Sequence, residues 1–154
     1  MRRRREHGLT LIELIVSFTI LLILTSMAVP LARAKVRHEK ERELRYVLRE
    51  IRAAIDKYKD ASDMGRLGPQ KLGTEGYPDD LQVLVDGVKL AGQVDKKVRF
   101  LRRIPKDPMT NTTDWGKRST QDDPKSNGWG GQNLFDVYTK STDRASDGTP
   151  YSEW

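Results

Sequence analysis

An uninterrupted apolar stretch, residues 9–29, most constrains what this chain can fold into. Glu13 is its one charged residue. At about 1.5 Å of rise per residue the stretch spans roughly 31 Å as a helix, close to the thickness of a bilayer's hydrocarbon core. A carboxylate inside such a span is costly, so Glu13 is expected to meet a partner rather than lipid. The sequence therefore predicts one membrane-spanning helix with a carboxylate near its start.

A short basic leader precedes this stretch. Residues 1–8, MRRRREHG, contain four consecutive arginines, and the positive-inside rule keeps such a segment in the cytoplasm. An ordinary secretory signal has a shorter apolar core followed by a small-residue cleavage site. Here the only small residue at the border between charged and apolar residues is Gly8, ahead of the span. Cleavage at Gly8 would leave the anchor attached to a head on the far side of the membrane.

The run GLTLIEL, from Gly8 to Leu14, resembles the N-terminal signal of type IV pilins and type II secretion pseudopilins. The resemblance implies that a prepilin peptidase cleaves the Gly8–Leu9 bond and methylates the new amine of Leu9. When subunits stack into a helical homopolymer, the Glu13 carboxylate could pair with the Leu9 amine of a neighbour, which removes two unpaired charges from lipid together. The alternative is a plain signal anchor, in which Gly8 is incidental and Glu13 reaches the membrane interface.

Length and charge limit the rest of the chain. Its 154 residues allow a leader (1–8), the membrane and assembly half of a long helix (9–30), an extramembrane stem helix (31–60) and a small head (61–154). The formal charge is +6, and removing the leader, with four arginines and Glu6, leaves +3. Affinity for phosphates needs a concentrated basic patch, so no nucleic-acid partner is expected from this small excess.

The stem is predicted to continue the apolar helix with one buried face. Pro30 lies inside the helical register and should kink the helix, because proline removes a hydrogen bond and clashes with the preceding turn. Basic residues of the stem are interpreted as its solvent side: Arg45, Arg49, Arg52, Lys57 and Lys59. Apolar residues at the i, i+3, i+4, i+7 spacing mark the face on which a head packs: Leu44, Val47, Leu48, Ile51, Ala54, Ile55 and Tyr58.

The head is predicted to combine one short helix with a small antiparallel sheet. Asp80 is a helix-capping residue ahead of an apolar run that stops at Gly87. Residues 133–139 read as a strand, paired with residues near 114–120 or 99–104. The segments YPDDLQVLVDG and FLRRIPKDPMT resemble those of major pseudopilins of type II secretion. Together these features predict an α+β, pilin-like fold.

The tail, residues 141–154, is also similar to the pseudopilin pattern, in which a loop binds calcium. That resemblance implies Ca²⁺ ligands at Asp143 and Asp147, with hydroxyl or carbonyl oxygens completing the shell. The alternative is a calcium-free turn, capped by Asp147 and Gly148 and pinned by Trp154.

No catalytic pattern is visible, because the chain has no phosphate-binding glycine loop and only His7 and His38 as imidazoles. The chain is therefore expected to be a structural subunit rather than an enzyme. The resemblance implies a type II secretion pseudopilin, anchored in a bacterial inner membrane with its head in the periplasm. Its partners would be itself, the prepilin peptidase, an inner-membrane assembly platform, minor pseudopilins and lipid. The alternative is a type IV pilin or a competence pseudopilin, forming a surface or DNA-uptake fibre.

Overall fold

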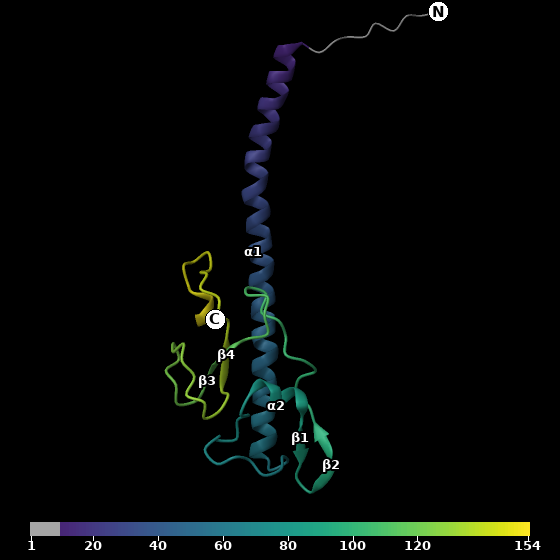
Figure 1. Cartoon of the computed structure of the whole chain (residues 1–154), viewed down its shortest axis with the longest axis vertical. Coiled ribbons are helices and arrows are strands. Elements are labelled where there is room, and N and C mark those ends of the chain that lie inside the picture. The colour runs from purple at the N-terminus through teal and green to yellow at the C-terminus, as the bar shows by residue number, and fades with distance from the viewer. Residues whose placement is uncertain (1–9) are drawn as a thin grey trace, which may run out of the picture. The chain divides into compact units, whose positions relative to one another are not determined.

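The computed structural model describes residues 10–154, apart from the side chains of residues 27, 28 and 93–95. The chain divides into two compact units, which are residues Met1–Glu39 and Lys40–Trp154. Each unit is described by itself. The long helix and small antiparallel sheets confirm the predicted α+β, pilin-like class. The elements are α1 (Leu11–Asp63), α2 (Leu81–Asp86), β1 (Val88–Leu90), β2 (Gln93–Val98), β3 (Gly116–Arg118), β4 (Asp136–Tyr138) and the 3-10 helix η1 (Tyr151–Glu153) (Figure 1).

Helix α1 ends at a glycine in the left-handed conformation. Gly65 has a φ of +64°, which glycine adopts without a steric penalty. Its N–H bonds to the carbonyl of Ser62 at 2.9 Å, and the N–H of Arg66 bonds to the carbonyl of Ala61 at 3.0 Å. These two bonds are the Schellman pattern that satisfies the last carbonyls of a helix. The helix therefore extends past residue 60 to Asp63.

The core of the second unit forms on the predicted face of α1. Burying a leucine or isoleucine side chain contributes about 1.5–3 kcal/mol, so this face is the main source of the unit's stability. Side chains from α2 and from the segments around β3 and β4 join the same cluster, among them Leu81, Leu84, Trp115, Leu134 and Val137. Each predicted residue of the α1 face is buried: Leu44, Val47, Leu48, Ile51, Ala54, Ile55 and Tyr58.

Helix α2 begins and ends where its sequence signals predicted. Asp80 is its N-cap, and the Asp80 side chain accepts a hydrogen bond from the N–H of Leu81. Gly87 is its C-cap, with a φ of +80°, and its N–H bonds to the carbonyl of Val83. A Cβ at position 87 would come within 2.8 Å of the carbonyl oxygen of Val98, so the close approach of β2 also requires glycine there.

Two separate two-stranded antiparallel sheets replace the single small sheet that was expected. Strand β4 pairs with β3, with Lys117 opposite Val137, which confirms the predicted pairing with residues near 114–120. The hairpin of β1 and β2 was not predicted. Its turn contains Gly92, with a φ of +74°, and its short first strand carries alternating Val88, Lys89 and Leu90.

A buried carboxylate anchors the PKDP segment to the end of β4. Asp107 is fully buried and accepts hydrogen bonds from the N–H of Met109 at 2.8 Å and from the hydroxyl of Thr110 at 3.1 Å. It also accepts a short hydrogen bond from the hydroxyl of Thr139. Because burying a carboxylate is costly unless donors surround it, this arrangement fixes the loop against the strand.

Arg52, which was predicted to lie on the solvent side of α1, has a side chain that is 36% exposed but that also forms contacts across the second unit. Its Nε lies 2.7 Å from Oδ1 of Asp136, and its guanidinium also donates to the carbonyl of Trp154 at 2.7 Å. Arg118 approaches the other carboxylate oxygen of Asp136 at 3.7 Å and donates to the carbonyl of Ser126. Asp136 therefore joins α1, β3 and the C-terminal segment through two arginines.

Replacing that carboxylate tests the arrangement. Asp136→Ala leaves the guanidinium of Arg118, whose side chain is 6% exposed, without its anion. We expect the free energy of unfolding to fall by about 2–4 kcal/mol, because removing one partner of a buried pair leaves an uncompensated charge. The measurement is urea unfolding of the full chain in nonionic detergent, followed by tryptophan fluorescence.

Asp114→Ala is the matched control. It removes a carboxylate that pairs with Lys140 but whose side chain is 72% exposed, so a loss below about 1 kcal/mol is expected. Equal losses in the two variants would contradict the structural role of Asp136.

Candidate functional site

The first unit exposes a continuous apolar helix surface. By length and composition, α1 contains a segment able to cross a membrane. Exposed apolar surface of this extent is unfavourable in water, so the segment needs lipid or protein around it. The exposed large apolar side chains range from 44% accessible at Leu14 to 78% at Leu11, and include Ile12, Ile15, Val16, Phe18, Ile20, Leu21, Leu22, Ile23, Leu24, Val29 and Leu31.

Thr10 and Glu13 organise the start of this helix. The Oγ1 of Thr10 accepts a hydrogen bond from the N–H of Glu13 at 3.3 Å, and the carbonyl of Thr10 accepts from the N–H of Leu14 at 3.2 Å. The spacing of Thr10 and Glu13 is that of a capping box, and a carboxylate in the first turn is also favoured by the helix dipole. This role of Thr10 was not predicted, although the Thr-x-x-Glu spacing signals it.

The Glu13 carboxylate is exposed on α1 and forms no ion pair or hydrogen bond with a described residue. Ser17, Thr19 and Thr25 are different, because each donates its hydroxyl to the carbonyl four residues earlier at 2.7 Å. These three hydroxyls are thus satisfied within the helix. Glu13 is the charged side chain of this described surface, so it is the one whose burial in lipid or protein most requires a partner.

Three other residues of this segment were predicted to have roles: Gly8, Leu9 and Pro30. Gly8 and Leu9, the predicted cleavage and methylation sites, lie outside the described residues, so both stay predictions. Pro30 lies inside α1, which continues through it to Asp63. A proline there has no N–H to donate, so the carbonyl of Ser26 lacks its usual helical partner. The kink at Pro30 stays a prediction.

Protein contacts close the C-terminal loop that was predicted to bind calcium. The N–H of Thr149 donates to Oδ1 of Asp147 at 2.9 Å, which holds the pKa of Asp147 below its ordinary value. Arg144 donates to the carbonyl of Gly148 at 3.0 Å. The ring of Trp154 packs edge-on against Tyr151, with centroids 4.9 Å apart. These contacts are the ones that the calcium-free alternative requires.

The residues of this loop fit Ca²⁺ poorly. Calcium takes six to eight oxygen ligands. Among the described side chains, no group of three or more His, Cys, Asp or Glu is placed to hold a metal ion. Asp143 and Asp147 would need backbone carbonyls, hydroxyls or water for most of the shell, and the Gly148 carbonyl already accepts from Arg144. Calcium at these two residues stays a prediction.

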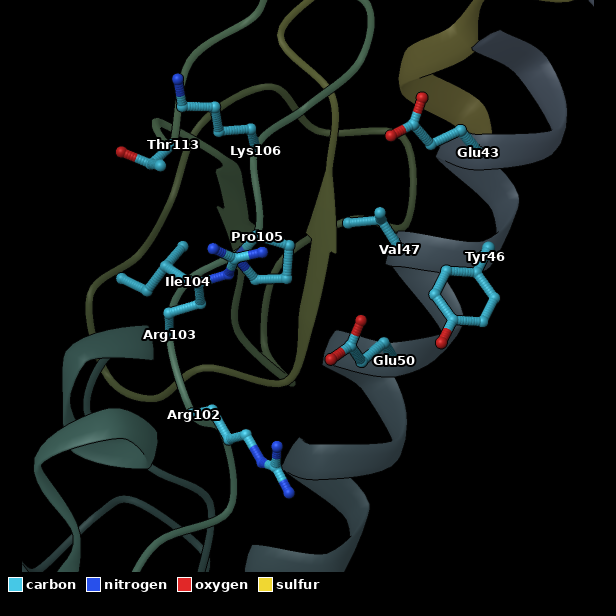
Figure 2. Close-up of a pocket in the computed structure, with 10 residues that line it drawn as sticks. All are labelled: Glu43, Tyr46, Val47, Glu50, Arg102, Arg103, Ile104, Pro105, Lys106 and Thr113. Atoms are coloured by element: carbon cyan, nitrogen blue, oxygen red, sulfur yellow. The ribbon is translucent and has the colours of Figure 1, made fainter. Parts of the chain in front are cut away.

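A groove with walls of opposite charge lies in the second unit (Figure 2). Its volume is about 560 Å³, and it separates α1 from the segment that follows β2. Glu43 and Glu50 line the α1 side, whereas Arg102, Arg103 and Lys106 line the other. No described ion pair joins the two sides.

Comparison with known proteins adds one decisive observation. Residues 3–29 match the family model described as the prokaryotic N-terminal methylation motif. The chain carries a prepilin-type N-terminal motif. This motif indicates a type IV pilin-like protein, and it implies processing by a prepilin peptidase and polymerisation of the pilus type. No curated protein and no solved structure matched the chain.

The calcium prediction has a thermal test. A site at Asp143 and Asp147 would add binding free energy to stability, about 2.7 kcal/mol when calcium is one hundred times the dissociation constant. For a head of this size the melting temperature should rise by on the order of 10 °C. The measurement is melting of the full chain in detergent, with calcium and with a chelator.

Asp143→Ala and Asp147→Ala should each abolish that calcium-dependent rise, and magnesium should replace calcium poorly because it requires a tighter octahedral shell. Asp123→Ala, in a different exposed loop, should keep it. Identical melting curves in calcium and chelator would contradict the site.

Proposed function

We propose that the mature chain is a structural, non-catalytic subunit of a type II secretion pseudopilus. The observation that carries this proposal is the prepilin-type motif joined to an exposed apolar helix whose carboxylate lacks a partner. Cleavage between Gly8 and Leu9 creates an amine four residues from Glu13. Pairing between that amine and the Glu13 carboxylate of a neighbour supplies the missing partner and sets the register of stacking.

In this proposal the apolar half of α1 first anchors the chain in a bacterial inner membrane and then moves into the filament core. The leader arginines keep the N-terminus cytoplasmic, so the head lies in the periplasm. An inner-membrane assembly platform and minor pseudopilins act on the growing filament. A separate cytoplasmic motor supplies the energy, because no phosphate-binding loop occurs in the sequence.

A type IV pilin or a competence pseudopilin is the second candidate, because the N-terminal motif is common to both classes. Two head segments favour secretion over this alternative. Helix α2 follows the Tyr77–Pro78 pair as in major pseudopilins, and Asp107 of the PKDP segment is a structural anchor rather than an exposed turn residue. The sequence also contains no cysteine pair of the kind that closes the C-terminal loop of many pilins.

Processing gives the first test of this function. Protein isolated from cells that contain a prepilin peptidase should begin at Leu9 and carry one methyl group on its amine. Gly8→Leu should keep the leader, because a bulky side chain prevents close approach of the extended backbone to the peptidase. Intact-mass measurement separates these forms. Gly8→Ala should be processed at least in part, and recovery of a wild-type mature form that starts at Met1 would refute the prepilin assignment.

Assembly gives the second test. Glu13→Ala should be cleaved and inserted normally but should form few filaments when expressed with the assembly machinery. A loss of about 1.4 kcal/mol per subunit contact lowers association about tenfold, so filament yield should fall at least that much. The readouts are sheared filament mass and the amount of protein secreted into the medium.

Glu39→Ala is the matched control, since it removes an exposed carboxylate of α1 outside the apolar segment. Wild-type filament yield from Glu13→Ala would show that Glu13 has no part in assembly. Filaments that form normally while deletion of the gene abolishes DNA uptake or surface motility, and not secretion, would favour the second candidate.

A further inference from the structure

The loop that joins β3 to β4 contains an asparagine followed directly by a glycine, Asn127 and Gly128 (Figure 1). The residue after an asparagine matters chemically, because its backbone nitrogen can attack the side-chain amide carbon and close a five-membered imide ring. Glycine obstructs this attack least, since it has no Cβ and adopts the widest range of backbone angles. The other two asparagines, Asn111 and Asn133, are each followed by a bulkier residue. Asn127 is therefore the asparagine of this chain whose sequence favours the reaction.

The structure leaves both reacting groups accessible. Asn127 and Gly128 are exposed, and the side-chain amide of Asn127 forms no hydrogen bond with a described residue. The N–H of Gly128 donates to Oγ of Ser126 at 3.0 Å, and that hydroxyl donates to the carbonyl of Gly128 at 3.1 Å. Gly128 lies outside the helices and strands, so its amide is restrained by one exposed hydroxyl. Exposed loop hydrogen bonds of this kind open at a low cost in free energy.

The other two asparagines are held in place. Asn133 is fully buried, its Oδ1 accepts from the N–H of Thr120 at 3.1 Å, and its Nδ2 donates to Oγ1 of Thr120 at 3.0 Å. Asn111 is exposed, but its N–H donates to the carbonyl of Asp107 at 2.7 Å in a tight turn where its φ is +58°. These two residues are internal controls for Asn127.

We infer that Asn127 and Gly128 form a site of spontaneous covalent modification, in which the asparagine is converted to aspartate and isoaspartate. The deprotonated backbone nitrogen of Gly128 attacks Cγ of Asn127. The bond from Cγ to the side-chain nitrogen breaks, and that nitrogen leaves as ammonia with the proton that the backbone nitrogen gave up. Water then opens the imide. Opening at Cγ gives an ordinary aspartate, and opening at the former backbone carbonyl carries the chain through the side chain as isoaspartate.

The isoaspartate product changes how the loop is attached to β4. In the unmodified chain, the hydroxyl of Tyr138 donates to the backbone carbonyl of Asn127 at 2.9 Å. In isoaspartate that carbonyl becomes a free carboxylate, and the backbone gains one carbon atom because it runs through Cβ and Cγ. Asn127 lines the same hollow as Lys140 and Arg144. The modification therefore places a new negative charge where the loop meets β4, beside two cations.

The test follows each asparagine of the purified full chain during incubation in nonionic detergent. A single folded subunit carries the whole site, so the test does not depend on filament assembly. After digestion, the peptide that contains Asn127 should gain about 1 Da, because the amide NH2 is replaced by a carboxyl oxygen. Peptides that contain Asn111 and Asn133 should keep their masses. Methylation by a protein isoaspartyl methyltransferase identifies the isoaspartate fraction, and a free peptide of residues 124–132 gives the rate without the fold.

Gly128→Ala tests the attacking group. A Cβ at position 128 would meet only Oγ of Ser126, at 3.6 Å, which is ordinary contact, so this variant should fold like the wild type. It should slow the conversion of Asn127 at least about tenfold, because a Cβ beside the attacking nitrogen crowds ring closure and narrows the range of backbone angles.

Three results would overturn the inference. A constant mass for the Asn127 peptide of the folded chain, while the free peptide is converted, would show that the fold protects the site. Equal conversion at Asn111, Asn127 and Asn133 would show hydrolysis that does not depend on the neighbouring glycine. An unchanged rate in Gly128→Ala would exclude ring closure at that nitrogen, whereas conversion confined to Asn127 and slowed in this variant supports the inference.

Discussion

The buried face of α1 from Leu44 to Tyr58 is the surface on which the rest of the second unit depends. Apolar side chains from α2, β4 and the connecting loops join it in one cluster, but the strands are short and long loops remain. With no cysteine in the sequence, these loops are held by buried polar groups. Asp107 ties the PKDP segment to Thr139, and Asn133 accepts from the N–H of Thr120. A hydrogen bond to a charged group such as Asp107 contributes about 1.5–3 kcal/mol, and one to a neutral amide such as Asn133 about 0.5–1.5 kcal/mol, so together they stabilise loops that have no disulfide.

The two units treat apolar surface in opposite ways. In the second unit, the apolar residues of α1 are covered by segments of the same chain. In the first, those of Leu11–Leu31 are exposed and find no cover among the described residues. In the proposed function this surface is buried first by lipid and then by neighbouring helices. The hydrophobic effect has no direction, so it cannot define how neighbours stack, whereas a single unpaired carboxylate at Glu13 can define one register.

Sequence reasoning succeeded where the signal is local. The α1 face follows from helical spacing, and the ends of α2 follow from Asp80 and Gly87. Prediction was weaker where distant segments meet. Two candidate partners were left open for β4. Arg52 was predicted to face solvent because its ion-pair partner, Asp136, lies 84 residues away in the sequence. The β1–β2 hairpin was missed because β1 has only three residues, too few for a periodic pattern. Within the candidate site, Glu13 was found from its charge in an apolar run, while Thr10 was overlooked as a small residue of that run.

The net charge of the chain and the charge at one position on its surface can likewise differ. The small positive excess expected after removal of the leader argued against a phosphate partner, yet electrostatic interactions at physiological ionic strength are screened over about 8 Å. A partner therefore responds to the residues it touches rather than to the mean. In the second unit, carboxylates such as Asp80 and Asp114 pair with lysines, and Asp136 pairs with the partly exposed Arg52 and the buried Arg118. Those carboxylates lower the net charge, and none of them pairs with Lys89 or Lys97 in the part of the second unit that the structure describes. Internal pairing leaves the net charge of the chain unchanged, but it distributes the unpaired charges unevenly over the second unit.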